Sequence, residues 1–187
     1  MVDAAISSVA PPSHPFDILL QLDQRGRARA PVAPAPGQLS DIRGRLALRL
    51  SAWNLLFSMD DVTEIIPIPR ITRVPGVKRW LLGIANLRGR VISVTDLRDF
   101  LVGKSTLQTP NSQIVVAHAG EWDYGLLVDE VIGMRYFGPQ HRLSSLDAVD
   151  AGLAPYITEA FINDNQHWLM FNISQLLSNP LFLNATS

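Results

Sequence analysis

The sequence contains no cysteine among its 187 residues, which excludes a disulfide scaffold, a thiolate zinc site, an iron–sulfur cluster and a cysteine nucleophile. Net charge is also small, with 16 Lys or Arg against 17 Asp or Glu. A nucleic-acid-binding protein is normally basic overall, because neutralising phosphates drives its affinity. No apolar run approaches the roughly 18 residues of a membrane span, and prolines interrupt the only place for a secretory signal. We therefore expect a cytoplasmic protein without membrane insertion.

Charge is distributed unevenly along the chain. Residues 41–104 carry eleven Lys or Arg against six Asp or Glu, whereas residues 105–187 carry two against eight. Oppositely charged halves suit protein partners better than a polyanion, although solvated surface charge alone would also give this pattern.

The chain divides into three parts by composition. Six of the thirteen prolines fall in the first 36 residues, and residues 25–37 form a Pro/Ala-rich linker. Before it, residues 16–24 have the pattern of a short amphipathic helix, which either docks on a surface or remains a frayed tail. We predict a leader and linker over residues 1–40, one domain over residues 41–182 and a tail over residues 183–187.

Short alternating runs dominate the predicted domain. A period of two predicts strands over residues 46–50, 54–58, 80–87, 91–95, 113–119, 124–131, 156–162 and 167–171. Helical patterns are brief, over residues 60–66, 97–101 after a capping Asp96, and 173–177 after a capping Asn172. Many short strands with few helices indicate a mainly β protein, a small barrel or sandwich.

An internal echo relates two hairpins. A strand, a turn, a second strand, a cap and one helical turn occur over residues 84–101 and again over residues 160–177, at an offset of 76 residues. The turns fall at Arg88-Gly89 and at Asp164-Asn165. We interpret this as two similar β subdomains related by a pseudo-repeat.

The sequence offers no catalytic constellation. The stretch ending in Gly103-Lys104-Ser105 lacks the first glycine of a phosphate-binding loop, because position 98 is arginine. The four histidines are dispersed, without metal-ligand spacing, and the adjacent pair Asp129-Glu130 would point to opposite faces of a strand. We expect no enzyme, no metal and no cofactor. Four tryptophans near basic residues leave a single-strand nucleic-acid binder as the weaker alternative.

Three segments closely resemble the CheW-like domains, the adaptors of bacterial chemosensory arrays. Residues 75–98 read PGVKRWLLGIANLRGRVISVTDLR and match the family signature, residues 124–134 read YGLLVDEVIGM, and residues 56–66 read LFSMDDVTEII. The leader and the phrase at residues 74–78 are similar to family members that serve type IV pilus systems. The resemblance implies two five-stranded β-barrel subdomains around a shared core.

The resemblance also implies partners and a site. Family members couple the cytoplasmic hairpin tip of a chemoreceptor to the regulatory domain of a CheA-type histidine kinase, here in control of twitching motility at membrane-bound receptor arrays. The matching partner-binding positions are Val62, Glu64, Gly83, Arg88, Ile114, Gly125 and Met134. The alternative within the family is the adaptor of a flagellar chemotaxis system.

Arg88 and Gly89 form the expected turn of the signature hairpin. Gly89 is suited to positive φ, and Arg88 offers a five-donor fork. That fork either binds a partner or bonds loop carbonyls as an internal clip, and the sequence leaves both interpretations open.

Overall fold

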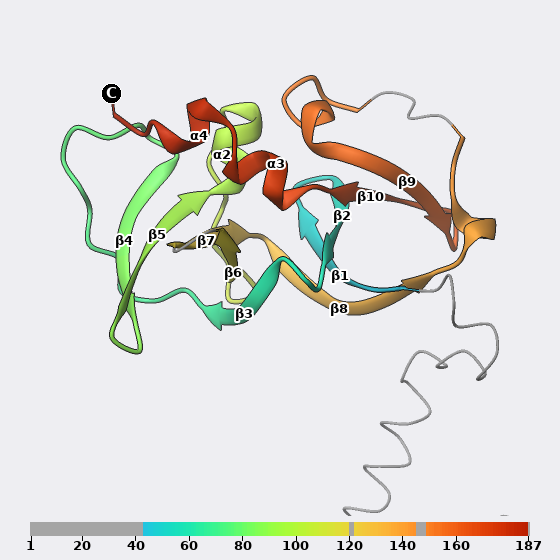
Figure 1. Cartoon of the computed structure of the whole chain (residues 1–187), viewed down its shortest axis with the longest axis horizontal. Coiled ribbons are helices and arrows are strands. Elements are labelled where there is room, and N and C mark those ends of the chain that lie inside the picture. Colours follow the sequence, from blue (N-terminus) through green and yellow to red (C-terminus); the bar gives the residue numbers. More distant parts are fainter. Residues whose placement is uncertain (1–42, 120–121, 145–148, 187) are drawn as a thin grey trace, which may run out of the picture. The chain divides into compact units, whose positions relative to one another are not determined.

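In the described part of the chain, ten strands form two mainly antiparallel sheets of five strands each (Figure 1). The structure is a computed structural model that describes residues 43–119, 122–144 and 149–186. The first sheet has the order β8-β1-β2-β10-β9, and the second has the order β3-β6-β7-β5-β4. The strands are β1 (Arg43–Leu50), β2 (Trp53–Ser58), β3 (Val62–Pro67), β4 (Leu81–Leu87), β5 (Arg90–Asp96), β6 (Gln113–Ala119), β7 (Trp122–Val128), β8 (Glu130–Phe137), β9 (Ile157–Asn163) and β10 (Gln166–Phe171).

Each sheet curls around an interior of its own. All five strands of the second sheet contribute to one buried cluster, which includes Ile66, Leu87, Ile92, Ile114 and Leu127. All five strands of the first sheet contribute to another, made by Ala47, Leu56, Phe137, Phe161 and Trp168. Since alternate residues point to opposite faces, the remaining apolar positions of β1, β2, β6 and β7 form a third cluster shared by the two sheets. This confirms the predicted mainly β fold with two five-stranded subdomains.

The two halves of the chain are interleaved. β1 and β2 lie in the first sheet while β3, β4 and β5 lie in the second, and the next five strands reverse this assignment. Both sheets have the same topology once the halves are exchanged, with parallel pairs β2–β10 and β5–β7. The predicted pseudo-repeat is therefore present, but each subdomain is built from both halves rather than from one repeat.

The hairpin turns of the echo agree with the sequence prediction. Arg88 and Gly89 join β4 to β5 with φ of 50° and 87°, and Asp164 and Asn165 join β9 to β10 with φ of 49° and 58°. Two consecutive residues with positive φ match the right-handed strand twist, and asparagine, aspartate and glycine reach this conformation at least cost.

The two predicted helix caps are also present. Helix α2 (Leu97–Val102) begins after Asp96, whose carboxylate accepts from the N–H of Asp99 at 3.1 Å. Helix α3 (Ile173–Leu177) begins after Asn172, whose side chain accepts from the N–H of Gln175 at 2.9 Å. Each cap satisfies an N–H that the first helical turn leaves without an intrahelical partner.

The C-terminal segment packs on the second sheet. Helix α4 (Pro180–Leu183) places Phe182 parallel to the ring of Trp80, with centroids 5.7 Å apart. Beyond it Thr186 pairs with Val77, and the N–H of Lys78 donates to the carbonyl of Ala185 at 2.8 Å. The segment from residue 183 to 186 is therefore held against the domain.

The helix predicted over residues 60–66 is wrong, because this segment forms β3. A bulge between Val62 and Glu64 shifts the register of β3 against β6 and breaks the simple alternation of a strand.

The single strand predicted over residues 124–131 is wrong, because this segment belongs to two strands, β7 and β8. Asp129 lies between β7 and β8, where its N–H donates to the carbonyl of Arg49 at 3.2 Å and the chain crosses to the first sheet.

The leader and the linker predicted over residues 1–40 lie outside the described residues. Within the described part of the chain, no helix is long and apolar enough to cross a membrane.

Candidate partner-binding site

Arg88 is presented to solvent at the tip of the β4–β5 hairpin. The N–H of Gly89 donates to the side-chain oxygen of Asn86 at 2.9 Å, which fixes the turn. The guanidinium of Arg88 lies 3.3 Å from the carboxylate of Glu64, yet the arginine side chain is 79% exposed. An internal clip needs a buried guanidinium, so that interpretation of Arg88 is wrong.

Charged side chains close the nearby end of the second subdomain. The guanidinium of Arg90 contacts the carboxylates of both Glu64 and Asp123, and Asp123 also bonds the imidazole of His118 at 2.8 Å. Each of these four charged side chains lies an even number of residues from a member of the buried interior cluster on the same strand. They therefore point to the same face as that cluster, at the end of the barrel. Asp123 is only 8% exposed, and pairing with Arg90 satisfies a carboxylate that would be costly to bury alone.

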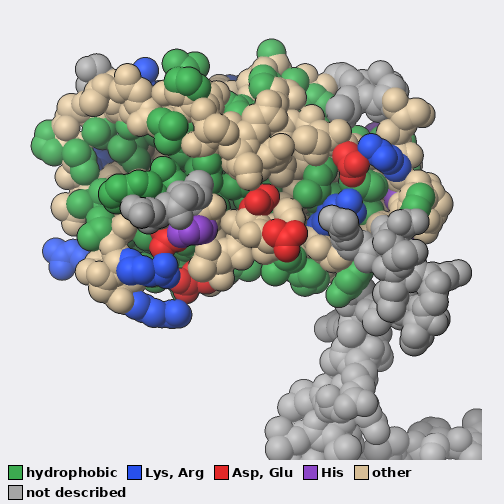
Figure 2. All heavy atoms as spheres, viewed as in Figure 1, with side chains coloured by type: hydrophobic (Ala, Val, Ile, Leu, Met, Phe, Trp, Pro, Cys, Tyr) green, Lys and Arg blue, Asp and Glu red, His purple; other side chains and the backbone are tan. Residues whose placement is uncertain are grey.

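The charged side chains are visible as one group in Figure 2. Basic, acidic and histidine side chains gather below the second sheet, at the end where Figure 1 draws the β4–β5 turn. We call Arg88, Glu64, Arg90, Asp123 and His118 the charged plug. Its two carboxylates are shielded while its arginines remain accessible, so it presents donors outward.

Three of the predicted site residues lie in the interior of the second sheet. Ile114 is fully buried, and a Cβ added at Gly125 would lie 2.9 Å from its Cγ2. Gly83 has φ of 142°, and a Cβ there would lie 2.2 Å from the carbonyl oxygen of Thr72. Glycine at positions 83 and 125 allows the close approach of Thr72 and Ile114, so these residues shape the sheet rather than line its surface.

Val62 and Met134 lie on β3 and β8, which are equivalent strands of the two interleaved halves. Val62 pairs with Ala117 at the bulge of β3, and 69 residues later Val131 pairs with Leu48 at the bulge of β8. The same offset relates Ile65 to Met134, and both are 37% exposed. Val62 is half-buried against the shared core. Met134 lies on the first sheet, so the structure does not bring all seven predicted residues together.

Two exposed apolar residues, next in sequence to Arg90 and Asp123, were missed from sequence. Val91 is 62% exposed and Trp122 is 67% exposed. The parallel ladder of β5 and β7 begins where Ser93 pairs with Tyr124, and Val91 and Trp122 each precede this pair by two residues on their strands. Trp53, the equivalent of Trp122 at the 69-residue offset, packs against the shared core instead. In the sequence, the only signal that Trp122 is exposed is its place next to the charged residue Asp123.

Exposed tryptophan and exposed arginine side chains are typical of protein interfaces. These two residue types are enriched among the side chains that dominate binding energy. Val91 and Trp122 expose apolar area on the opposite strand face from Arg90 and Asp123, and Arg88 exposes a guanidinium at the adjoining turn. We call Val91, Trp122 and Arg88 the hairpin surface.

The remaining tryptophans are unsuited to stacking on bases. Trp168 is buried, and Trp80 packs between Phe100 and Phe182 with centroid distances of 5.2 and 5.7 Å. Trp80 also precedes β4 rather than lying in it. The aromatic platform required by the nucleic-acid alternative is therefore missing at these two positions.

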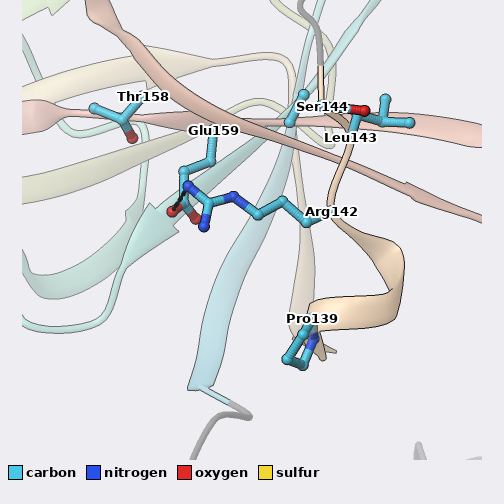
Figure 3. A pocket seen from close by; sticks show the side chains of 7 residues that line it. Pro139, Arg142, Leu143, Ser144, Thr158 and Glu159 are labelled. Carbon is cyan, nitrogen blue, oxygen red and sulfur yellow. Dashed lines mark ion pairs between the residues drawn. The ribbon is translucent and has the colours of Figure 1, made fainter.

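A pocket of about 540 Å³ lies beside β9 (Figure 3). Figure 3 shows the guanidinium of Arg142 reaching Glu159, with 2.9 Å between the charged atoms. Glu159 also lies 3.6 Å from Arg45, so charges in this pocket compensate one another. Among the described residues, no group of three His, Asp or Glu side chains could hold a metal ion.

The comparisons with known proteins identify the family. The CheW-like domain matches residues 45–180, so the chain belongs to the CheW-like family. It is 34% identical over 172 residues to "Protein PilI" of Pseudomonas aeruginosa, covering 91% of this chain and 96% of that protein. It is also 34% identical over 89 residues to "Chemotaxis protein CheW" of Thermotoga maritima, covering 48% of this chain and 58% of that protein.

A solved structure shares the fold. The scaffolding protein TtCheW from Thermoanaerobacter tengcongensis superposes with a TM-score of 0.63 at 18% identity, covering 75% of this chain and 91% of that chain. The similarity to PilI extends over nearly the whole chain. The chain is thus a PilI-like member of the CheW-like family.

Proposed function

We propose that this protein is a non-catalytic adaptor that couples a chemoreceptor to a CheA-type histidine kinase. It holds the receptor's cytoplasmic hairpin tip and the kinase's regulatory domain together in the cytoplasm, at membrane-bound receptor arrays. The receptor state then changes the orientation of the kinase. No chemical step occurs on the adaptor. Its role is to fix the relative positions of the receptor and the kinase.

The observation that carries this proposal is the hairpin surface. Arg88 is exposed at a two-residue turn, and Val91 and Trp122 on the neighbouring strands β5 and β7 expose apolar area to solvent. Burying large apolar side chains and pairing a guanidinium are the main sources of free energy in protein interfaces. Met134, with its exposed neighbour Tyr136, offers a second apolar surface on the first sheet. Two surfaces on two sheets suit a protein that binds two partners.

Similarity supports the pilus system over a flagellar one. The match to PilI covers 91% of this chain, whereas the match to the Thermotoga maritima CheW covers 48%. We therefore propose that the receptor and kinase belong to a type IV pilus system and that the adaptor acts in twitching motility.

A co-purification experiment tests this function. Tagged chain is mixed with a lysate from cells that express type IV pili, and the bound proteins are identified by mass spectrometry. The expected bound proteins are a chemoreceptor and a CheA-type kinase, and the one that binds the hairpin surface is depleted when the bait carries Arg88→Ala. The control bait is Arg49→Ala, which removes an arginine from a similar surface pair with Glu130 on the first sheet. Recovery of neither protein by the wild-type bait contradicts the proposal.

A further inference from the structure

Positive charge is concentrated in the middle of the chain. Residues 70–104 contain eight Lys or Arg and two acids, Asp96 and Asp99. Both acids are buried and engaged inside the protein, since Asp96 caps α2 and Asp99 pairs with Arg79. Glu64 and Asp123 from other strands compensate Arg88 and Arg90. The remaining basic residues of this segment have no acidic partner among the described residues.

Two of these unpaired cations line a pocket of about 310 Å³. Arg73 and Lys78 line it together with Arg79 and with Ser105, whose hydroxyl donates to Asp99 at 3.3 Å. Its walls are aliphatic, formed by Val74, Val77, Leu81 and Leu82. We call this the loop pocket, because the loop from Arg73 to Arg79 forms most of it.

Hydrogen bonds hold the loop pocket in shape. At one end of the loop, Thr72 and Ile84 exchange backbone bonds of 2.8 and 2.9 Å. At the other end, the N–H of Lys78 donates to Ala185 at 2.8 Å and the N–H of Leu81 donates to Lys78 at 3.0 Å. Preformed walls reduce the entropy cost of binding, because the loop need not be ordered by the ligand.

Arg79 is fixed as a charged part of the wall. Its guanidinium donates to both carboxylate oxygens of Asp99, at 2.8 and 2.6 Å, and to the carbonyl of Gly103 at 2.8 Å. These hydrogen bonds and the carboxylate charge raise the pKa of Arg79 above its ordinary value. The carboxylate of Asp99 therefore compensates the positive charge of Arg79. Arg73 and Lys78 remain as the positive charges available to a ligand.

We propose that the loop pocket binds an acidic peptide segment of a partner protein, with one or two aliphatic side chains in the pocket and carboxylates at Arg73 and Lys78. The aliphatic walls contribute apolar burial, and the two unpaired cations select for negative charge. A nucleic acid fits less well, because the lining side chains include no aromatic ring on which a base could stack.

This site goes beyond the proposed receptor and kinase coupling at the hairpin surface. Leu81 and Arg88 stand at opposite ends of β4, about 20 Å apart along the strand. Loss of one site is therefore distinguishable from loss of the other.

Fluorescence anisotropy with defined peptides tests the proposal. The probe is a fluorescein-labelled peptide of four leucines and four glutamates, titrated with the full chain at low salt. We expect saturable binding that weakens at least tenfold in the double variant Arg73→Ala, Lys78→Ala, and that weakens with added salt. The matched control is Arg49→Ala, Arg135→Ala, which removes two arginines from the first sheet. We expect less than a twofold effect, with thermal melts confirming that each variant folds.

Two further probes separate the acidic peptide from general charge attraction. A peptide with serine in place of leucine is expected to bind at least fivefold more weakly, and a single-stranded oligonucleotide no more tightly than the serine peptide. Equal affinity for the leucine and serine peptides, tighter binding of the oligonucleotide, equal losses in the two double variants, or no binding at millimolar protein would each overturn the proposal. Arg88→Ala is expected to leave the binding of the probe unchanged, whatever it does to receptor and kinase.

Discussion

Arg88 and Glu64 form an ion pair with unequal environments, since the arginine is 79% exposed while the glutamate is largely shielded by the sheet. Exposed ion pairs contribute about 0–1 kcal/mol to folding, so the fold does not depend on this arginine. A guanidinium held by one shielded carboxylate and otherwise open to solvent is suited to meet acidic or carbonyl groups of a partner.

Arg88→Ala is expected to weaken receptor or kinase binding by about 2 kcal/mol, roughly thirtyfold, as for an arginine hot spot. Its melting temperature should stay close to that of the wild type. Calorimetric titration and thermal melts on the same sample measure the two effects. A lowered melting temperature with unchanged affinity of the folded protein would contradict the binding role, and Arg49→Ala serves as the control.

Arg90 and Asp123 should be coupled in folding. Because Asp123 is almost fully buried, removing Arg90 leaves a shielded carboxylate without its strongest partner. A double-mutant cycle with Arg90→Met and Asp123→Asn is expected to give a coupling free energy of about 1–3 kcal/mol by urea unfolding. Additive single effects would show that the charged plug does not stabilise this end of the barrel.

Gly83→Ala should lower stability through the backbone. The added Cβ would overlap the carbonyl oxygen of Thr72 at a φ of 142°, so the bridge between Thr72 and β4 must shift. We expect a loss of about 2–4 kcal/mol. Gly76→Ala is the control, because Gly76 also has positive φ but no atom within 4 Å of an added Cβ; its cost should be about 1 kcal/mol. Equal losses would mean that the close contact with Thr72 is not the cause.

Phe182→Ala should destabilise the domain although it lies at the C-terminal end. Its ring packs with Trp80, Phe100 and Tyr124 at centroid distances of 5.1 to 6.0 Å. Truncation of such a ring costs about 3–5 kcal/mol. Leu181→Ala, at a neighbouring exposed position, should change stability by less than about 0.5 kcal/mol. Comparable melting temperatures for both variants would show that α4 is dispensable.

Local chemistry made much of the fold predictable from sequence. The positive-φ turns and the caps Asp96 and Asn172 were correctly placed because each depends on a few adjacent residues. The segment over residues 60–66 was misassigned because a bulge between Val62 and Glu64 is imposed by pairing with β6, which no local pattern encodes. The interleaving of the two halves was not predicted for the same reason, because it depends on which distant strands pair.

The candidate site was less predictable than the fold. Arg88 and Glu64 were named from the family signature, but their contact joins a hairpin turn to β3 across the barrel. Alternation alone cannot separate a strand face that is covered from one that is open, so Val91 and Trp122 were missed. The roles of Gly83 and Gly125 required the distances to Thr72 and Ile114, which only three-dimensional packing supplies.

The central claim is that the adaptor holds receptor and kinase at the same time. Titration calorimetry of a receptor signalling fragment into the full chain, alone and then saturated with the kinase regulatory domain, tests this most directly. The account predicts binding in both titrations, with affinities on the order of micromolar that differ by less than about fivefold, and a ternary complex by light scattering. Loss of receptor binding in the presence of the kinase domain would contradict it, because the two partners would then compete for one surface.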